Sequence, residues 1–135
     1  MKLFSVVVLF LLMHSESLAQ CNRIHFVNSS LSFAYSKAQT EDKNVFIFIY
    51  DEGDAKTNFI ESGIFYKPDI CRLFNEKFIN IKIKSKSMDA QDLIRRNRLE
   101  KFPAYLIIDK NRVVRHKTSS IQNSSDLMTF GRRMR

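Results

Sequence analysis

Hydrophobic residues occur along the chain in short blocks, and several of these blocks predict β-strands. Residues 44–50 (NVFIFIY) are a continuous run of β-branched and aromatic residues, as expected for a strand buried on both faces of a sheet. Residues 78–84 (FINIKIK) alternate apolar with polar residues, which is typical of a strand near a sheet edge. Residues 104–109 and 112–117 flank the turn DKNR and predict a β-hairpin, in which we expect Asn111 to take the left-handed conformation.

Between these blocks, apolar residues recur three and four positions apart, a spacing that places them on one face of an α-helix. Pro68 suits the first turn of such a helix, and serine is a good N-cap because its hydroxyl accepts a hydrogen bond from a free backbone N–H. Five helices are expected: 29–43 capped by Ser29 or Ser30, 55–62 ended by Gly63, 68–78, 87–101 capped by Ser87, and 123–135 capped by Ser124 or Ser125.

The order of these elements predicts the architecture. The first two strands are connected through a helical region, so they should be parallel, whereas the last two form a hairpin and should be antiparallel. We therefore expect an α/β fold, a three-layer sandwich in which a mixed four-stranded sheet has helices on both faces.

The first nineteen residues carry a separate pattern. Lys2 precedes the mostly apolar run 3–13, and small residues follow at Ser17 and Ala19. A positive head, a short apolar run and small residues before a cleavage point are typical of a secretory signal peptide. The run is short for a membrane span. We therefore predict a signal peptide over residues 1–19.

The remainder, residues 20–135, is expected to be one domain that is secreted or periplasmic after cleavage. A lipid anchor on Cys21 is not favoured, because the residue before a lipid-modified cysteine is normally small and this chain has Gln20. The favoured interpretation of Cys71 is a small buried hydrophobic residue within its helix. The alternative is a disulfide between Cys21 and Cys71, because export would place the chain in an oxidising compartment.

The chain has a formal net charge of +8, and removing residues 1–19 takes away one lysine and one glutamate, so the mature domain keeps this excess. A solvated surface is the simpler interpretation of the basic residues. The functional interpretation is attraction to an acidic partner, to anionic lipid headgroups or to polyanionic glycans. Nucleic acid is not expected, because no aromatic residues are interleaved with the charges. The basic clusters are Arg95, Arg96, Arg98 and Lys101; Arg112, Arg115 and Lys117; and Arg132, Arg133 and Arg135.

No metal or cofactor is expected from the sequence. His25 and His116 stand far apart, and neither has a cysteine or histidine at the spacing of a zinc site. A glycine-rich phosphate-binding motif is also absent.

Three segments, taken in order, resemble the thioredoxin-like superfamily, and in particular its secreted DUF255-like and anterior-gradient-like branches. They are AQTEDKNVFIFIY, then IFYKPDICRLFNEKFINIKI, then LEKFPAYLIIDKNRVV. The second segment has matching residues at Phe65, Ile70, Asn75 and Phe78. The third segment places Pro103 where the family has its cis-proline. The resemblance implies a cis bond between Phe102 and Pro103, with the backbone before the proline open to an extended polypeptide.

The family's cysteine pair is missing. The resemblance aligns the two positions of its C-x-x-C motif with Asp54 and Thr57, and no cysteine lies near them in this chain. Dithiol chemistry needs a thiolate of low pKa at a helix start and a second thiol that resolves the mixed disulfide. The position of a buried carboxylate found in some thioredoxins falls on Phe48, so that group is missing as well.

The resemblance thus implies a redox-inactive protein that binds a protein or peptide partner through a groove. The groove residues are Gly53, Asp54, Ala55, Lys56, Thr57, Phe102 and Pro103. The alternative is a thiol-disulfide oxidoreductase or isomerase-like enzyme that uses Cys21 or Cys71 alone. An enzyme of this class needs a thiol in the loop before the helix, so the loop sequence favours the binding protein.

We predict that the exported protein begins at Gln20, because Ser17 and Ala19 are the small residues that define the cleavage point. Intact-mass analysis of the exported protein should show the loss of residues 1–19. A retained Met1, or a lipid-modified Cys21, would contradict the assignment to a soluble exported protein.

Overall fold

The computed structural model describes residues 21–133, so the predicted signal peptide and its cleavage point lie outside the described residues. The elements in chain order are α2 (Leu31–Glu41), β1 (Asn44–Tyr50), α3 (Ala55–Ser62), the short 3-10 helix η2 (Ile64–Tyr66), α4 (Pro68–Lys77), β2 (Phe78–Lys84), α5 (Met88–Asn97), β3 (Ala104–Ile108), β4 (Val114–Thr118) and α6 (Ser124–Arg132).

The strands form one mixed sheet in the order β2-β1-β3-β4. β1 pairs in parallel with β2, from Asn44 opposite Phe78 to Tyr50 opposite Lys84. It pairs antiparallel with β3, and β3 pairs antiparallel with β4. The predicted four-stranded sheet, with its parallel pair and its hairpin, is confirmed.

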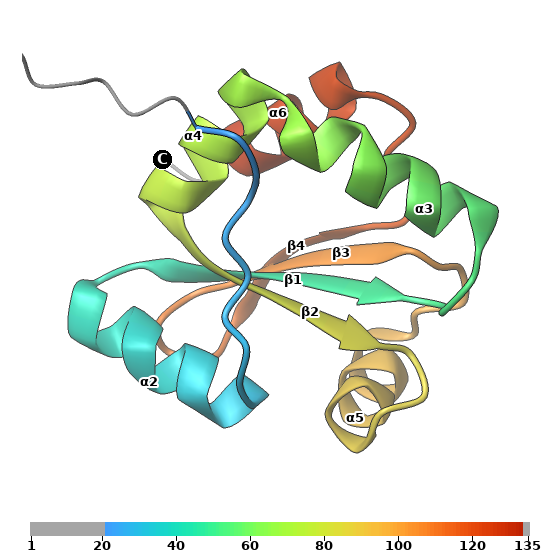
Figure 1. Cartoon of the computed structure of the whole chain (residues 1–135). Helices are drawn as coiled ribbons and strands as arrows, with labels where there is room; N and C mark the ends of the chain where they lie inside the picture. Colours follow the sequence, from blue (N-terminus) through green and yellow to red (C-terminus); the bar gives the residue numbers. More distant parts are fainter. Residues whose placement is uncertain (1–20, 134–135) are drawn as a thin grey trace, which may run out of the picture.

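Helices cover both faces of the sheet, which confirms the predicted three-layer sandwich. Figure 1 shows α3, α4 and α6 on one face and α2 and α5 on the other. Because successive side chains of a strand point to opposite faces, β1 supplies both hydrophobic cores. Phe46 and Phe48 belong to the core under α3, α4 and α6, and Val45, Ile47 and Ile49 to the core over α2 and α5.

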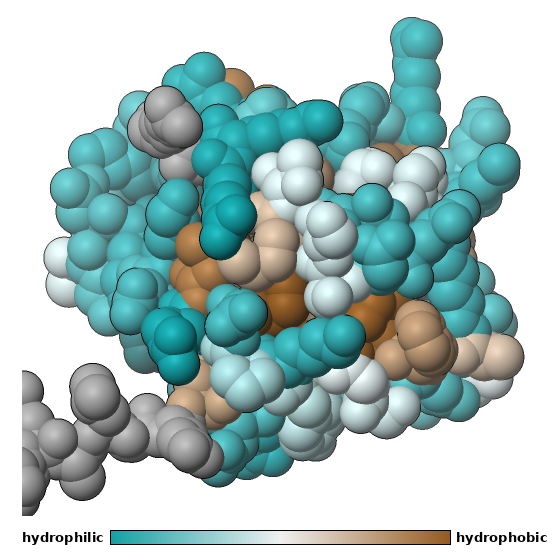
Figure 2. Space-filling model, turned by 90° about the horizontal axis from the view of Figure 1, so that it is seen from above, coloured by the Kyte–Doolittle hydropathy of each residue, from teal (hydrophilic) through white to brown (hydrophobic). Residues whose placement is uncertain are grey.

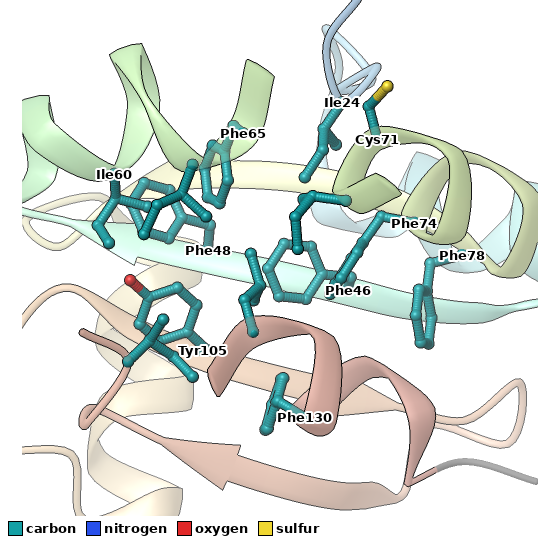
Figure 3. Close-up of a cluster of buried hydrophobic side chains, with 14 of the residues drawn as sticks. Ile24, Phe46, Phe48, Ile60, Phe65, Cys71, Phe74, Phe78, Tyr105 and Phe130 are labelled. Carbon is teal, nitrogen blue, oxygen red and sulfur yellow. The ribbon is translucent and has the colours of Figure 1, made fainter. Parts of the chain in front are cut away.

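The core under α3, α4 and α6 is rich in aromatic rings (Figure 3). The Phe46 ring lies 4.6 Å from the Phe74 ring in an edge-to-face arrangement, and the Phe48 ring lies 4.9 Å from the Phe65 ring in the same arrangement. Such pairs add stabilisation beyond the burial of their surface. They fix α4 and η2 on the sheet, and thereby the position of α3.

Residues 21–27, here called the strap, cross the edge of the sheet from beside α4 to the start of α2 (blue in Figure 1). Two backbone–backbone hydrogen bonds hold it: Ile24 N–H donates to the Phe65 carbonyl at 3.2 Å, and Val27 N–H donates to the Asn80 carbonyl at 2.8 Å. The strap pairs with β2 at one isolated bridge, Phe26 opposite Asn80.

The start of the strap is held on α4 by a disulfide and an asparagine. Cys21 and Cys71 are bonded, with their Cα atoms 5.9 Å apart, so the structure contains the bridge rather than a free Cys71 thiol. The Asn75 side chain accepts a hydrogen bond from His25 N–H at 2.8 Å and donates one to the Arg23 carbonyl at 3.0 Å. One amide therefore fixes the strap backbone on both sides of Ile24, whose side chain is buried.

Two details of the sequence prediction are wrong. In the hairpin turn, Arg112 rather than Asn111 has the positive φ, 65°. The Asp109 carboxylate accepts hydrogen bonds from the N–H groups of Asn111 and Val113, which fixes this turn. The last helix is capped by Asn123, whose side chain accepts from Asp126 N–H at 2.9 Å, rather than by a serine.

We predict that removing the disulfide lowers the free energy of unfolding. The bridge closes a loop of 50 residues, and such a cross-link stabilises by about 4 kcal/mol, chiefly by restricting the unfolded chain. A Cys21→Ala/Cys71→Ala double variant should lose most of this amount in urea denaturation. Reduced wild-type protein should match the variant, and the variant should not respond to a reductant. Equal stability of oxidised and reduced wild type would contradict the prediction.

Candidate functional site

The candidate groove lies where β1 ends and β3 begins. Ile49 of β1 is paired with Ala104 of β3, and continuing this antiparallel register sets Tyr50 opposite Pro103. The Phe102–Pro103 peptide bond is cis. The register thus places the predicted Phe102 and Pro103 next to the loop that follows β1. Pro103 is buried, and Phe102 packs against the core over α2 and α5.

The loop between β1 and α3, residues 51–54, is fixed by polar contacts to the end of β2. The Ser85 hydroxyl donates to the Asp51 carboxylate, and the Lys84 ammonium is 3.1 Å from the Glu52 carboxylate. Gly53 has a φ of +79°, a conformation that residues with a side chain rarely adopt. The loop therefore turns sharply at an exposed glycine and then enters α3.

Asp54 caps the start of α3. Its carboxylate accepts a hydrogen bond from Thr57 N–H at 3.0 Å, which satisfies one of the free N–H groups of the first turn. A negative charge here also interacts favourably with the positive end of the helix dipole. The same helix end would lower the pKa of a cysteine thiol. In this chain the Asp54 carboxylate occupies the helix end and caps it.

Thr57 points inward and differs in this from its exposed neighbours Ala55 and Lys56. It is 2% exposed, and its hydroxyl has no hydrogen-bond partner in residues 21–133. The Tyr105 hydroxyl is also buried without a partner there. Figure 3 shows Tyr105 reaching from β3 toward Ile60 of α3, and burial raises the pKa of its phenol.

The structure does not bring the cysteines to this groove. Cys71 is on α4 and is bonded to Cys21 of the strap, whereas Asp54 and Thr57 begin α3. The predicted site residues 53–57 and 102–103 thus include no sulfur atom, and the Thr57 side chain is buried rather than exposed to the groove. Phe48, which the sequence resemblance aligns with a buried carboxylate of some thioredoxins, is fully buried among aromatic rings.

A cavity of about 670 Å³ lies outside the predicted groove, and the sequence analysis missed it. It is formed between the strap, α3, η2 and β2. Its lining residues are Arg23, Ile24, His25, Phe26, Asn58, Glu61, Ser62, Phe65, Tyr66 and Lys82. The alternating lysines of residues 78–84 are the one sequence signal near it, and they were interpreted as surface residues of an edge strand.

The outer surface of the helix layer also carries exposed aromatic residues. Figure 2 views this layer from above and shows hydrophobic side chains in its middle, surrounded by hydrophilic ones. Phe59 of α3 is 60% exposed and Tyr66 of η2 is 52% exposed.

Within residues 21–133, no cluster of three or more potential metal ligands occurs. No helix in that range is both long enough and apolar enough to cross a membrane.

Comparison with known proteins identifies the fold. No protein-family model matches the chain, and no curated protein matches it in sequence. Solved structures do match. A candidate disulphide isomerase from Bacteroides thetaiotaomicron is similar with a TM-score of 0.73 and 21% identity, covering 82% of this chain and 92% of that one.

Two further structures have the same fold. A thioredoxin from Thermus thermophilus matches with a TM-score of 0.69 and 16% identity, over 84% of this chain and 86% of its own. The C-terminal domain of Neisseria meningitidis DsbD, in the oxidised form, matches with a TM-score of 0.64 and 15% identity, over 83% and 99%. At these identities the likeness shows the fold: this chain has a thioredoxin fold.

We predict that Thr57→Val raises the free energy of unfolding by about 1 kcal/mol, because it replaces an unpaired buried hydroxyl by a methyl group of similar size. Urea denaturation measures the change. Thr118→Val is a matched control that should not stabilise, since the Thr118 hydroxyl accepts a hydrogen bond from Ser120 N–H at 3.1 Å. A loss of stability in Thr57→Val would show that this hydroxyl has a partner.

Proposed function

We propose that this chain is an exported, redox-inactive thioredoxin-fold protein that binds a polypeptide through the groove between residues 53–57 and Phe102-Pro103. The observation that carries the proposal is the capping of α3 by the Asp54 carboxylate at one of the two positions of the family's cysteine pair. On this proposal the chain keeps the backbone of a thiol site and has oxygen atoms in place of the reactive sulfur atoms.

The second position supports the same conclusion. Thr57 is buried, and its hydroxyl cannot form a mixed disulfide with a substrate. The groove still offers the backbone that precedes Pro103, and an extended polypeptide could pair with it through main-chain hydrogen bonds. Binding of this kind needs no reactive side chain. The partner is therefore a protein or peptide, and the excess of basic residues favours one with an acidic surface.

One observation favours a second candidate. The Cys21–Cys71 disulfide is a redox-active group in principle, so a thiol-disulfide oxidoreductase that uses one of these cysteines is the alternative function. Cys71 is fully buried, and Cys21 is partly exposed. Reactive cysteines lie in partly exposed, electropositive surroundings. That description does not fit Cys71, and the bridge fits a structural role that holds the strap on α4.

The proposal predicts no reduction of insulin disulfides by the wild-type protein above the level of a Cys71→Ser control. Reduction by a thioredoxin-type protein begins with attack of a thiolate from the loop, and this loop has Asp54 and Thr57 instead. An Asp54→Cys/Thr57→Cys variant should gain measurable activity, because a thiol at the start of α3 would meet the same helix end.

The outcomes separate the two candidates. Activity in the wild type that disappears in Cys71→Ser would establish the oxidoreductase and overturn the binding protein. An inactive Asp54→Cys/Thr57→Cys variant that folds normally would show that the groove does not have the geometry of a thiol site.

A further inference from the structure

β2 is one of the two edge strands of the sheet, and the strap covers only the first part of it. The one strap–strand bridge joins Phe26 to Asn80, and Val27 N–H donates to the Asn80 carbonyl at 2.8 Å. Beyond Asn80 the strap turns away into α2. It leaves Lys82 to Lys84 uncovered, and Lys82 lines the 670 Å³ cavity.

The backbone of Lys82 faces outward. In a strand, the N–H and C=O groups of alternate residues point to the same side. The Asn80 carbonyl points outward to the strap, whereas Ser85 N–H points inward to the Tyr50 carbonyl of β1 at 2.8 Å. Alternation therefore directs the N–H and C=O of Lys82 outward, where no strand of the described chain pairs with them.

Along this part of β2, charged side chains alternate with an apolar one. Lys82 and Lys84 are exposed on the face that bears α3, and Ile83 between them packs against the core over α2 and α5. The Lys82 ammonium lies 3.0 Å from the Glu61 carboxylate and 5.7 Å from the centre of the Phe26 ring. Arg23 and His25 line the same cavity. Lys84 is likewise 3.1 Å from the Glu52 carboxylate. The excess of basic groups beside the open backbone therefore comes from the strap.

We propose that this edge binds an extended acidic peptide by strand addition. Its backbone would pair with Lys82, and its side chains would follow the alternation of β2. Carboxylates at every second position would face Lys82, Lys84 and Arg23, while the intervening apolar side chains would lie beside Ile83. Opposite charges and matched apolar residues on facing strands both stabilise a sheet. The cavity would give room to the acidic side chains, and its aromatic lining residues Phe26, Phe65 and Tyr66 would contact their methylene groups.

The charge pattern argues against a second copy of this chain as the occupant. Pairing two β2 edges would set lysines against lysines, and like charges on facing strands are destabilising. Edge lysines commonly prevent such self-association. An acidic strand would instead place carboxylates opposite Lys82 and Lys84, and this interaction is attractive. The lysines that disfavour a second copy therefore favour the proposed peptide.

The test is a titration with a synthetic peptide of alternating glutamate and valine, followed by ¹⁵N NMR and by fluorescence anisotropy of a labelled peptide. Two comparison peptides keep the net charge. One has the glutamates grouped together, and the other is N-methylated at alternate amides, which removes its strand hydrogen bonds. Lys82→Glu is the test variant. Lys110→Glu is its matched control, because Lys110 is also exposed and ion-paired, 2.7 Å from Asp42, away from the cavity.

We expect the alternating peptide to shift the amide signals of residues 82–84 and of Arg23 to Phe26. Lys82→Glu should weaken binding about fivefold or more, and Lys110→Glu should change it less than about twofold. The N-methylated and grouped peptides should bind more weakly than the alternating one. Equal binding of all three peptides, equal effects of the two variants, or signal shifts confined to other residues would overturn the proposal.

Discussion

The burial of β1 on both faces is the constraint on which the rest of the structure depends. Val45 to Ile49 are fully buried without interruption, and each such side chain contributes roughly 2 kcal/mol relative to an exposed one. A strand of this kind needs a helix layer on each side, because either face would otherwise expose apolar surface. The sandwich, the pairing with β2 and β3, and the position of the loop after Tyr50 all follow from that one segment.

The groove and its chemistry come from different parts of the sequence. The paired ends of β1 and β3 set Pro103 beside residues 51–57, whatever the side chains of that loop are. The chemistry depends on which residue meets the N-terminal end of α3. The Asp54 carboxylate accepts a hydrogen bond from Thr57 N–H, and its negative charge interacts favourably with the positive end of the helix dipole. The start of α3 is therefore stable without a reactive group. The thioredoxin fold is thus compatible with a stable start of α3 that carries no thiol.

The sequence predicted the strands and the sheet well, because their signals are local. The apolar run 44–50 and the alternation of 78–84 each define a strand without reference to the rest of the chain. The strap could not be predicted, since its position depends on contacts between distant residues, above all those of Asn75 with Arg23 and His25. The cavity depends on the strap and was missed for the same reason. In the hairpin turn, the side chain of Asp109 set the backbone, so the intrinsic preference of Asn111 did not decide it.

The disulfide also changes how the molecule would respond to mechanical force. Cys21 is bonded to Cys71, so a load applied to the chain ahead of Cys21 passes through the sulfur atoms directly into α4. Residues 22–70, which include β1 and α3, lie inside the covalent loop and cannot be extended by that load. Under tension from the two ends of the chain, the elements after α4, namely β2, α5, β3, β4 and α6, would have to carry the load. If another polypeptide pulled on this protein from its amino-terminal side, the loop at 51–57 would be shielded while the bond remained intact.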